Sequence, residues 1–425
     1  MLAIISLFIE CAICAVLKTL GIDPISDVLA VALVCVFSIA FIIDVSNDEK
    51  QKYSGCIICG YLLRVFLLFF DYFGKSIYHL PNSGADTEMF YKYSVMLANG
   101  LTSEKYGGFI GLFGRVFSII GTSRLYGQFI VMLFSIIALL VIIKTIEELS
   151  ISNEQKIRAV SLVSIIPNYA ILSSIFLRES IVSMFVSISL YMFIQYYKGN
   201  SYIYLVFCYA SVLLGMVFHS GIAGFLIGYG IIILIHQNGM EENRTGFIRL
   251  LIASLACGIS LFLFINYKDV LFAKFLSVND ITDVANTVAR GGSTYAKYVG
   301  DSTSILNVLV YTLPRFAYFL FSPFPWQWRG GADLIAFFFS GLYYLGIVII
   351  SFGKLFNSKT QYRALLKNML IIMFCSTFVF AWGVSNVGTA VRHRDKLISV
   401  FAVLHALCYD YDKGWHIIVG DKEII

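Results

Sequence analysis

Charged residues are scarce in this chain: only 13% of its 425 residues are Asp, Glu, Lys or Arg, whereas 59% are hydrophobic. Soluble domains carry about 25% charged residues, so this shortage excludes an ordinary water-soluble fold. Long polar stretches are missing too, because the longest ones, 73–108 and 267–303, have only the size of loops. The composition therefore predicts a polytopic membrane protein.

Motifs for nucleotides and metals are also missing. The sequence has no glycine-rich nucleotide loop, no paired His-Glu zinc motif and no nucleophile elbow. The Cys56 and Cys59 pair has no second half for a zinc site, and the other cysteines lie in or beside apolar runs. The scattered net charge of +5 predicts no nucleic acid partner. No cofactor is expected; a divalent metal is allowed but not required.

Apolar runs of about 17 to 25 residues are what the sequence has in abundance, and each can cross a membrane as a helix. The expected fold is all-α, a polytopic transmembrane helical bundle of about 12–13 spans that forms a single integral membrane domain over 1–425. The expected spans are 2–20, 26–44, 55–72, 126–146, 158–177, 179–197, 202–218, 220–236, 248–266, 304–322, 333–352, 364–383 and 395–410. Residues 109–124, which glycines interrupt, favour a short interfacial helix.

Charge predicts the orientation of these spans. Short segments that carry most of the lysines, at 44–52, 144–158, 236–249 and 354–367 and in the turn at Lys198, are typical of the cytoplasmic side. The outer loops 73–125 and 267–332 then face outward, and we expect them to contribute to a site. Strict alternation fails once, so we expect a re-entrant segment near 304–332.

Two carboxylates, Asp86 and Glu88, follow the third apolar run. Such a pair can hold a divalent cation, or one carboxylate can act as a general base while the other orients a substrate. The alternative is a solvated loop. Gly84 before the pair and the aromatic run after it favour a turn into a packed helix.

Arg178, Glu179 and His219 are predicted at outer ends of spans. A charge inside an apolar stretch such as 171–193 is usually paired or lines a wet cavity. Imidazole can accept a proton or donate to a phosphate oxygen near neutral pH. The alternatives are a tight turn at Arg178 and Glu179, and an interface histidine at His219.

Several further arginines, and the aromatic-rich segment 321–328, also fall on the predicted outer side. Guanidinium groups grip phosphate oxygens bidentately, and aromatic faces stack on sugar rings, so the set favours an anionic sugar substrate. Structural clamping or headgroup anchoring is the alternative for each residue taken singly. The candidate binding residues are Arg290, Arg315, Trp326, Arg329, Arg392, His393 and Arg394.

Short motifs in this sequence resemble the EpsG-type and Wzy-type polysaccharide polymerases. They are Asp86 with Glu88, the 176–179 junction, 218–220, 322–326 and 388–394. The resemblance implies a multi-pass glycosyltransferase of the bacterial cytoplasmic (inner) membrane that polymerises undecaprenyl-pyrophosphate-linked oligosaccharide repeat units for O-antigen, capsule or exopolysaccharide. It implies membrane lipid as a partner and leaves open a chain-length regulator.

By this resemblance Arg178 and His219 are the first residues expected in the site, followed by Arg315, Arg392 and Arg394 as phosphate binders. Glu179 departs from the uncharged polar residue expected there, so it is either catalytic or the partner of an arginine. Two alternatives stay open. One is a GT-C transferase that uses a polyprenyl-phosphate sugar and relies on Asp86 and Glu88; the other is a flippase or transporter of lipid-linked oligosaccharides.

Overall fold

The computed structural model describes residues 1–22, 26–47, 52–101, 107–199, 201–235, 295, 305–357 and 362–408, and this part of the chain is helical without strands. The first helices are α1 (Leu2–Thr19), α2 (Asp27–Ser46), α3 (Ser54–Phe73), α4 (Ala85–Ala98), α5 (Gly108–Ile120), α6 (Arg124–Glu147), α7 (Asn153–Ile165), α8 (Pro167–Ser174), α9 (Glu179–Tyr197), α10 (Ile203–Met216), η1 (Ser220–Ile222) and α11 (Ala223–Ile235). Then follow α15 (Ile305–Phe321), η3 (Pro325–Gln327), α16 (Gly331–Ala336), η4 (Phe337–Gly341), α17 (Leu342–Phe356), α18 (Arg363–Trp382), α19 (Val387–Arg394), η5 (Asp395–Leu397) and α20 (Ile398–Cys408). The predicted all-α class is confirmed.

Seven helical units in the described residues are long and apolar enough to cross a membrane: α1, α2, α3, α6, α9, the unit Gly331–Phe356 and α18. The bent pair α7 and α8 is either an eighth, broken span or a re-entrant loop. The chain is therefore a multi-pass helical membrane protein. The sequence-based count of about 12–13 also included shorter helices such as α10, α15 and α20, and the run 248–266, which lies outside the described residues.

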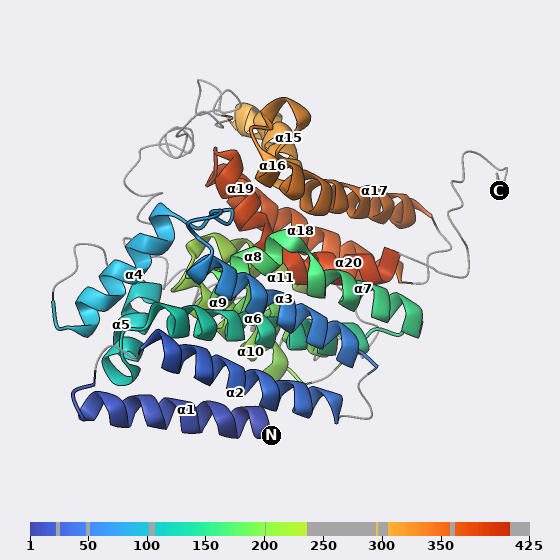
Figure 1. Ribbon diagram of the computed structural model, residues 1–425. Coiled ribbons are helices and arrows are strands. Elements are labelled where there is room, and N and C mark those ends of the chain that lie inside the picture. Colours follow the sequence, from blue (N-terminus) through green and yellow to red (C-terminus); the bar gives the residue numbers. More distant parts are fainter. Residues whose placement is uncertain are drawn as a thin grey trace.

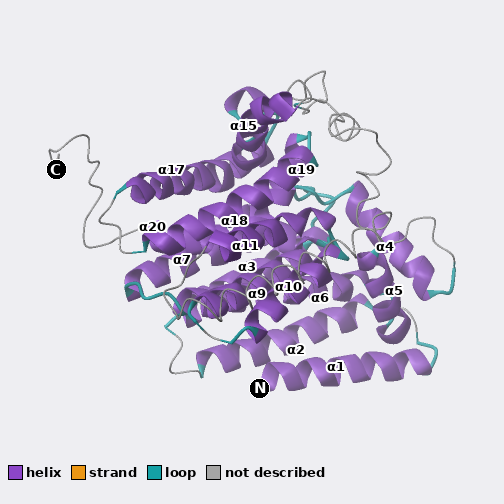
Figure 2. Cartoon of the chain, turned by 180° about the vertical axis from the view of Figure 1, so that it is seen from behind, coloured by secondary structure: helices purple, strands orange, loops and turns teal. Residues whose placement is uncertain are grey.

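The long helices lie side by side, with α1 and α2 at one edge of the array and α17 at the opposite edge (Figures 1 and 2). Three shorter helices, α4, α5 and α19, gather toward one end of the array, on the left in Figure 1 and on the right in Figure 2. We call this end the α4 end. The short helix predicted within residues 109–124 corresponds to α5. The acidic pair, Asp86 and Glu88, lies in the first turn of α4.

The expected span 158–177 is not one straight helix. Pro167 begins α8 after Ile166, whose ψ of 116° is not helical, and the axes of α7 and α8 differ by 49°. Proline cannot donate the helical hydrogen bond and clashes with the preceding turn, which explains the break. After α8 the chain is extended at Ile175, and α9 begins at Glu179 with Arg178 as its N-cap. The pair Arg178 and Glu179 therefore lies in a junction between helices.

Close packing joins α11 to α18. A Cβ at Gly224 would lie 2.6 Å from Ser376 Cα and 2.7 Å from Cys375 O, so only glycine allows this approach. Small residues at helix contacts are typical of membrane bundles, where neighbouring backbones pack closely. This contact holds α11, and with it the turn at His219, against α18.

Ion pairs join three lysine-rich segments at the other end of the bundle. Lys52 lies 2.9 Å and Lys156 3.6 Å from Glu147, and Lys198 pairs with Glu148. These segments, predicted to share the cytoplasmic face, thus lie together. Which membrane face they occupy, and whether 304–332 re-enters the membrane, stay predictions.

Candidate functional site

The acidic pair at the start of α4 divides between two sets of partners. Residues two apart on a helix point about 200° apart. Asp86 Oδ2 accepts a hydrogen bond from Arg392 Nη1 at 2.5 Å, across 306 positions of sequence. Glu88 instead pairs with Lys75 and, at 2.5 Å, with Arg124. The two carboxylates therefore do not point toward one ligand, although their spacing in the sequence was compatible with a shared divalent cation.

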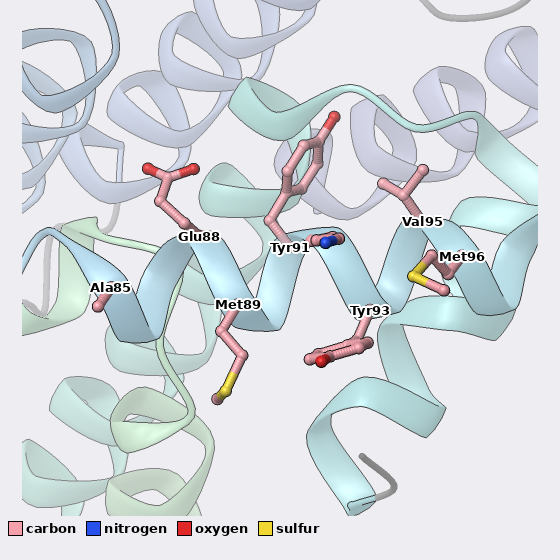
Figure 3. Close-up of a pocket in the computed structure, with 8 residues that line it drawn as sticks. Ala85, Glu88, Met89, Tyr91, Tyr93, Val95 and Met96 are labelled. Atoms are coloured by element: carbon pink, nitrogen blue, oxygen red, sulfur yellow. The ribbon is translucent and has the colours of Figure 1, made fainter. Parts of the chain in front are cut away.

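Glu88 belongs to a surface network at the end of α3 and the start of α6. Its partial burial would raise the pKa of its carboxyl, but the bonds from Arg124 and Lys75 outweigh this and lower that pKa. A pocket runs along α4 beside it, and Figure 3 shows Glu88 and Tyr91 on one side of the helix and Met89 and Tyr93 on the other. This pocket is lined by α4 alone and contains no arginine.

Glu179 lies at the centre of a second, largely buried group of charges. Its side chain is 4% exposed, and its Oε1 is 3.1 Å from Arg392 Nε and 3.4 Å from Lys396 Nζ. Its position in the first turn of α9 is favourable for a negative charge. Among the described residues, no hydrogen-bond partner reaches its Oε2. Glu179 is thus the arginine partner that the sequence reading kept as one of two options.

Arg178 and Arg392 approach Glu179 and Asp86 from different elements. Arg178 Nη1 donates to Phe218 O at 3.1 Å, so the N-cap of α9 is tied to the turn before His219. Burial would lower the pKa of Arg392, but Glu179 and Asp86 outweigh it and raise that pKa. In the part of the chain that the structure describes, the Nε atom of Arg178 lacks a hydrogen-bond partner, whereas the Nε atom of Arg392 faces Glu179 Oε1 in the ion pair at 3.1 Å.

Two histidines complete the group. His219 Nε2 lies 3.1 Å from His393 Nε2, and His393 Nδ1 lies 2.7 Å from Lys396 Nζ. Burial and the neighbouring cations hold the pKa of His393 well below its usual range, so its imidazole is neutral at pH 7. We call Asp86, Arg178, Glu179, His219, Arg392, His393 and Lys396 the mixed-charge cluster.

Arg394 and Arg315 point away from this cluster into the protein. Arg394 is buried and donates to Ala336 O at 2.9 Å, Leu320 O at 3.0 Å, Ser340 Oγ at 2.9 Å and Ser322 O. Arg315, also buried, donates to Ala381 O at 2.9 Å and Val384 O at 2.7 Å. Both guanidinium groups clamp backbone carbonyls, which is the structural alternative considered for them. The phosphate-binding role predicted for them has no support in this geometry.

The remaining predicted binding residues lie outside the mixed-charge cluster. Trp326 is 72% exposed and stacks on Phe324 at 4.8 Å, and Arg329 lies 3.8 Å from Asp333. Both thus have partners within their own segment. Arg290 lies outside the described residues.

Lys396 is the cluster member that sequence reasoning missed. It was counted within the apolar run 395–410, although it follows His393 by three positions and so lies on the same side of a helix. That spacing was the available signal. Its side chain is fully buried, which is rare for lysine without a specific partner.

The residues named for a transport path have separate surroundings. Arg64 is buried against Gly60 O and Ser164 O, at 2.8 and 2.7 Å, and Asp71 accepts from Gln128 at 2.8 Å. Arg115 is exposed on α5. These contacts give no sign of one continuous polar path through the described bundle.

Comparison with family profiles, curated proteins and solved structures finds no match to this chain. The fold and the cluster therefore define its class by themselves. It is a multi-pass helical membrane protein that carries a buried, mixed-charge cluster toward one end of its bundle.

Proposed function

We propose that this protein is a membrane glycosyltransferase that polymerises undecaprenyl-pyrophosphate-linked oligosaccharide repeat units on the outer face of the bacterial cytoplasmic membrane. The observation that carries the proposal is the convergence of two arginines, two carboxylates and two histidines from four distant segments in one cluster. The resemblance of its motifs to EpsG-type and Wzy-type polymerases adds to this support.

The arginines would bind the pyrophosphate of the donor. Arg178 keeps an Nε–H without a hydrogen-bond partner among the described residues, and guanidinium is the group best suited to phosphate oxygens. A phosphate would take the place of Asp86 on Arg392, because the Asp86 side chain is 49% exposed and can leave. The released carboxylate would then orient the acceptor sugar, while the arginines stabilise the charge of the leaving pyrophosphate.

The acceptor hydroxyl needs a base, and His219 is the candidate. It is partly exposed, whereas Glu179 is buried and committed to Arg392 and Lys396. In the proposed reaction the hydroxyl oxygen attacks the anomeric carbon, the bond from that carbon to the pyrophosphate breaks, and the hydroxyl proton passes to His219.

A deletion strain tests this function. Extracts of the strain should accumulate one lipid-linked repeat unit exposed on the outer face and should contain no long polymer. Complementation with the intact gene should restore long chains, whereas R178K and R392K should not, because lysine cannot bind phosphate bidentately.

E88Q is the matched control, since Glu88 lies at the same end of the bundle outside the cluster, and it should restore polymer. Repeat units confined to the inner face would favour a flippase. Absence of any complete repeat unit would favour a transferase that adds one sugar. Either result contradicts polymerisation.

A further inference from the structure

A chain of four nitrogen and oxygen contacts runs from the turn at His219 into the protein. Gly221 N lies 3.1 Å from His219 Nδ1, and the two histidine Nε2 atoms are 3.1 Å apart. His393 Nδ1 is 2.7 Å from Lys396 Nζ, which in turn is 3.4 Å from Glu179 Oε1. His219 is partly exposed, whereas His393 and Lys396 are buried, so the chain has one end near water and one end inside.

Hydrogen-bonding rules fix the direction of this chain. A neutral imidazole has one N–H donor and one acceptor nitrogen, and a backbone N–H can only donate. His219 Nδ1 must therefore be the acceptor for Gly221, and His219 Nε2 carries the hydrogen. His393 Nε2 then accepts it, so His393 Nδ1 carries the hydrogen that points at Lys396 Nζ.

An ammonium group cannot accept that hydrogen, because it has no lone pair. A neutral amine at Lys396 can accept from His393 and donate to Glu179, and every contact in the chain is then satisfied. With an ammonium at Lys396, either two hydrogens face each other between the histidines, or Gly221 N–H loses its acceptor. Only the neutral lysine fits all four contacts.

Charge balance around Lys396 agrees with the neutral form. Glu179 faces it from α9 with Arg178 close by, and Arg392 and His393 face it from α19. The ring of Phe380 on α18 lies 5.8 Å away, and the neighbouring Asp395 is turned to Asn168 and Tyr344.

Two carboxylates, Asp86 and Glu179, balance the two arginines Arg178 and Arg392. A charged Lys396 would leave one uncompensated charge in this buried cluster, which is costly.

We propose that His219, His393 and Lys396 form a proton relay in which a neutral Lys396 amine receives the proton that enters at His219 Nδ1. When a proton binds there, His219 Nε2 passes its hydrogen to His393 Nε2, and His393 Nδ1 passes its hydrogen to Lys396. Lys396 becomes an ammonium beside Glu179, and both histidines end as the opposite neutral tautomers. In the proposed glycosyl transfer, on which this role rests, the proton comes from the acceptor hydroxyl.

Nitrogen-15 NMR of the histidines tests the relay without any need for substrate. The chain has six histidines, so ¹⁵N-histidine protein in phosphatidylethanolamine and phosphatidylglycerol vesicles can be assigned with H219N and H393N. At pH 8 we expect the hydrogen on Nε2 of His219 and on Nδ1 of His393. As the pH falls, both tautomers should reverse together with one apparent pKa, because the sites are coupled.

Variants at Lys396 sharpen the test. K396R carries a permanent charge, so it should fix the hydrogen of His393 on Nε2 at every pH, and K396M should abolish the joint reversal. K156M, which changes a lysine at the other end of the bundle, should leave both signals unchanged. If His393 in the intact protein has its hydrogen on Nε2 at pH 8, as in K396R, the proposed neutral lysine is wrong.

Polymer synthesis by reconstituted protein gives a second readout. K396M should lower the turnover about 100-fold, the usual size of a general-base contribution, and should flatten its pH profile. Unchanged turnover would refute the catalytic use of the relay. A different pair of results separates the relay from the proposed function. If the two histidine tautomers reverse together but the deletion strain still makes long polymer, the proposed function is refuted and the relay stands.

Discussion

Removal of Arg392 should destabilise the protein mainly by leaving Glu179 without its closest cation. Glu179 is 4% exposed, and after the substitution R392M its carboxylate would keep the Lys396 amine at 3.4 Å and the more distant guanidinium of Arg178, but would lose the arginine that pairs with it at 3.1 Å. Breaking a buried ion pair from one side typically costs about 3–5 kcal/mol. The second partner of Arg392, Asp86, is 49% exposed, and an exposed pair contributes only about 0–1 kcal/mol. The loss should therefore be near 3–5 kcal/mol and should originate at Glu179.

A double-mutant cycle locates the loss. The free energy of unfolding can be measured in mixed micelles of detergent and SDS for the intact protein, R392M, E179Q and the double variant. Glutamine is neutral, so E179Q/R392M contains no stranded charge at position 179. Its free energy of unfolding should therefore be about 1–3 kcal/mol higher than that of R392M. D86N should cost no more than about 1 kcal/mol. If the double variant is no more stable than R392M, a stranded Glu179 charge is not the cause, and this reasoning is refuted.

Three further outcomes can be measured, the first as protein yield and the other two as the free energy of unfolding. Replacement of Arg394 by alanine should remove the clamp on Leu320 O, Ala336 O and Ser340 and lower the yield of monodisperse protein. R394K should restore little of this yield, since one ammonium cannot reach all these acceptors. A normal yield of R394A would contradict the structural role. Because the pKa of His393 is depressed in the folded protein, the unfolded chain binds more protons than the folded one below about pH 6.5. The free energy of unfolding should therefore fall as the pH falls through that value, by up to about 1.4 kcal/mol per pH unit. H393Q should remove this part of the pH dependence. G224A should destabilise the protein by about 1–3 kcal/mol, because its Cβ would meet the backbone of α18. G230A is the control and should be tolerated, because its Cβ would lie 3.7 Å from Tyr209 Oη. Equal stabilities of the two variants would show that α11 and α18 can separate without cost.

The helices could largely be predicted from the sequence because membrane spans depend on the length and polarity of local segments. The expected run 55–72 corresponds to α3, and 364–383 corresponds to α18. The bend at Pro167 was missed, since proline in a membrane helix kinks some helices and is accommodated in others. The number of full crossings could not be fixed, because α10 and the unit Ser220–Ile235, which includes α11, are apolar but shorter than a complete span.

The site was harder to predict, because its contacts join residues far apart in the chain. Reading the residues one by one gave Arg392 and Arg394 the same expected role, yet the first reaches Asp86 and the second reaches carbonyls of the 320–336 region. Two positions on one helix point in different directions, and only the packing of α19 decides what each direction meets. Lys396 was missed for the same reason, since its burial beside Glu179 depends on how α9 and η5 meet.

The long sequence separation within the cluster has a consequence for biosynthesis. Glu179 is separated from Arg392 by 392 − 179 = 213 positions, so the carboxylate emerges from the ribosome long before its cation. At about 5–20 residues per second, the delay is roughly 10–40 s. During this interval the nascent protein carries a carboxylate that is buried in the finished protein but lacks its closest cation, and an unpaired buried charge is costly. We therefore expect the newly made chain to be most sensitive to quality-control proteases before its last helices are inserted.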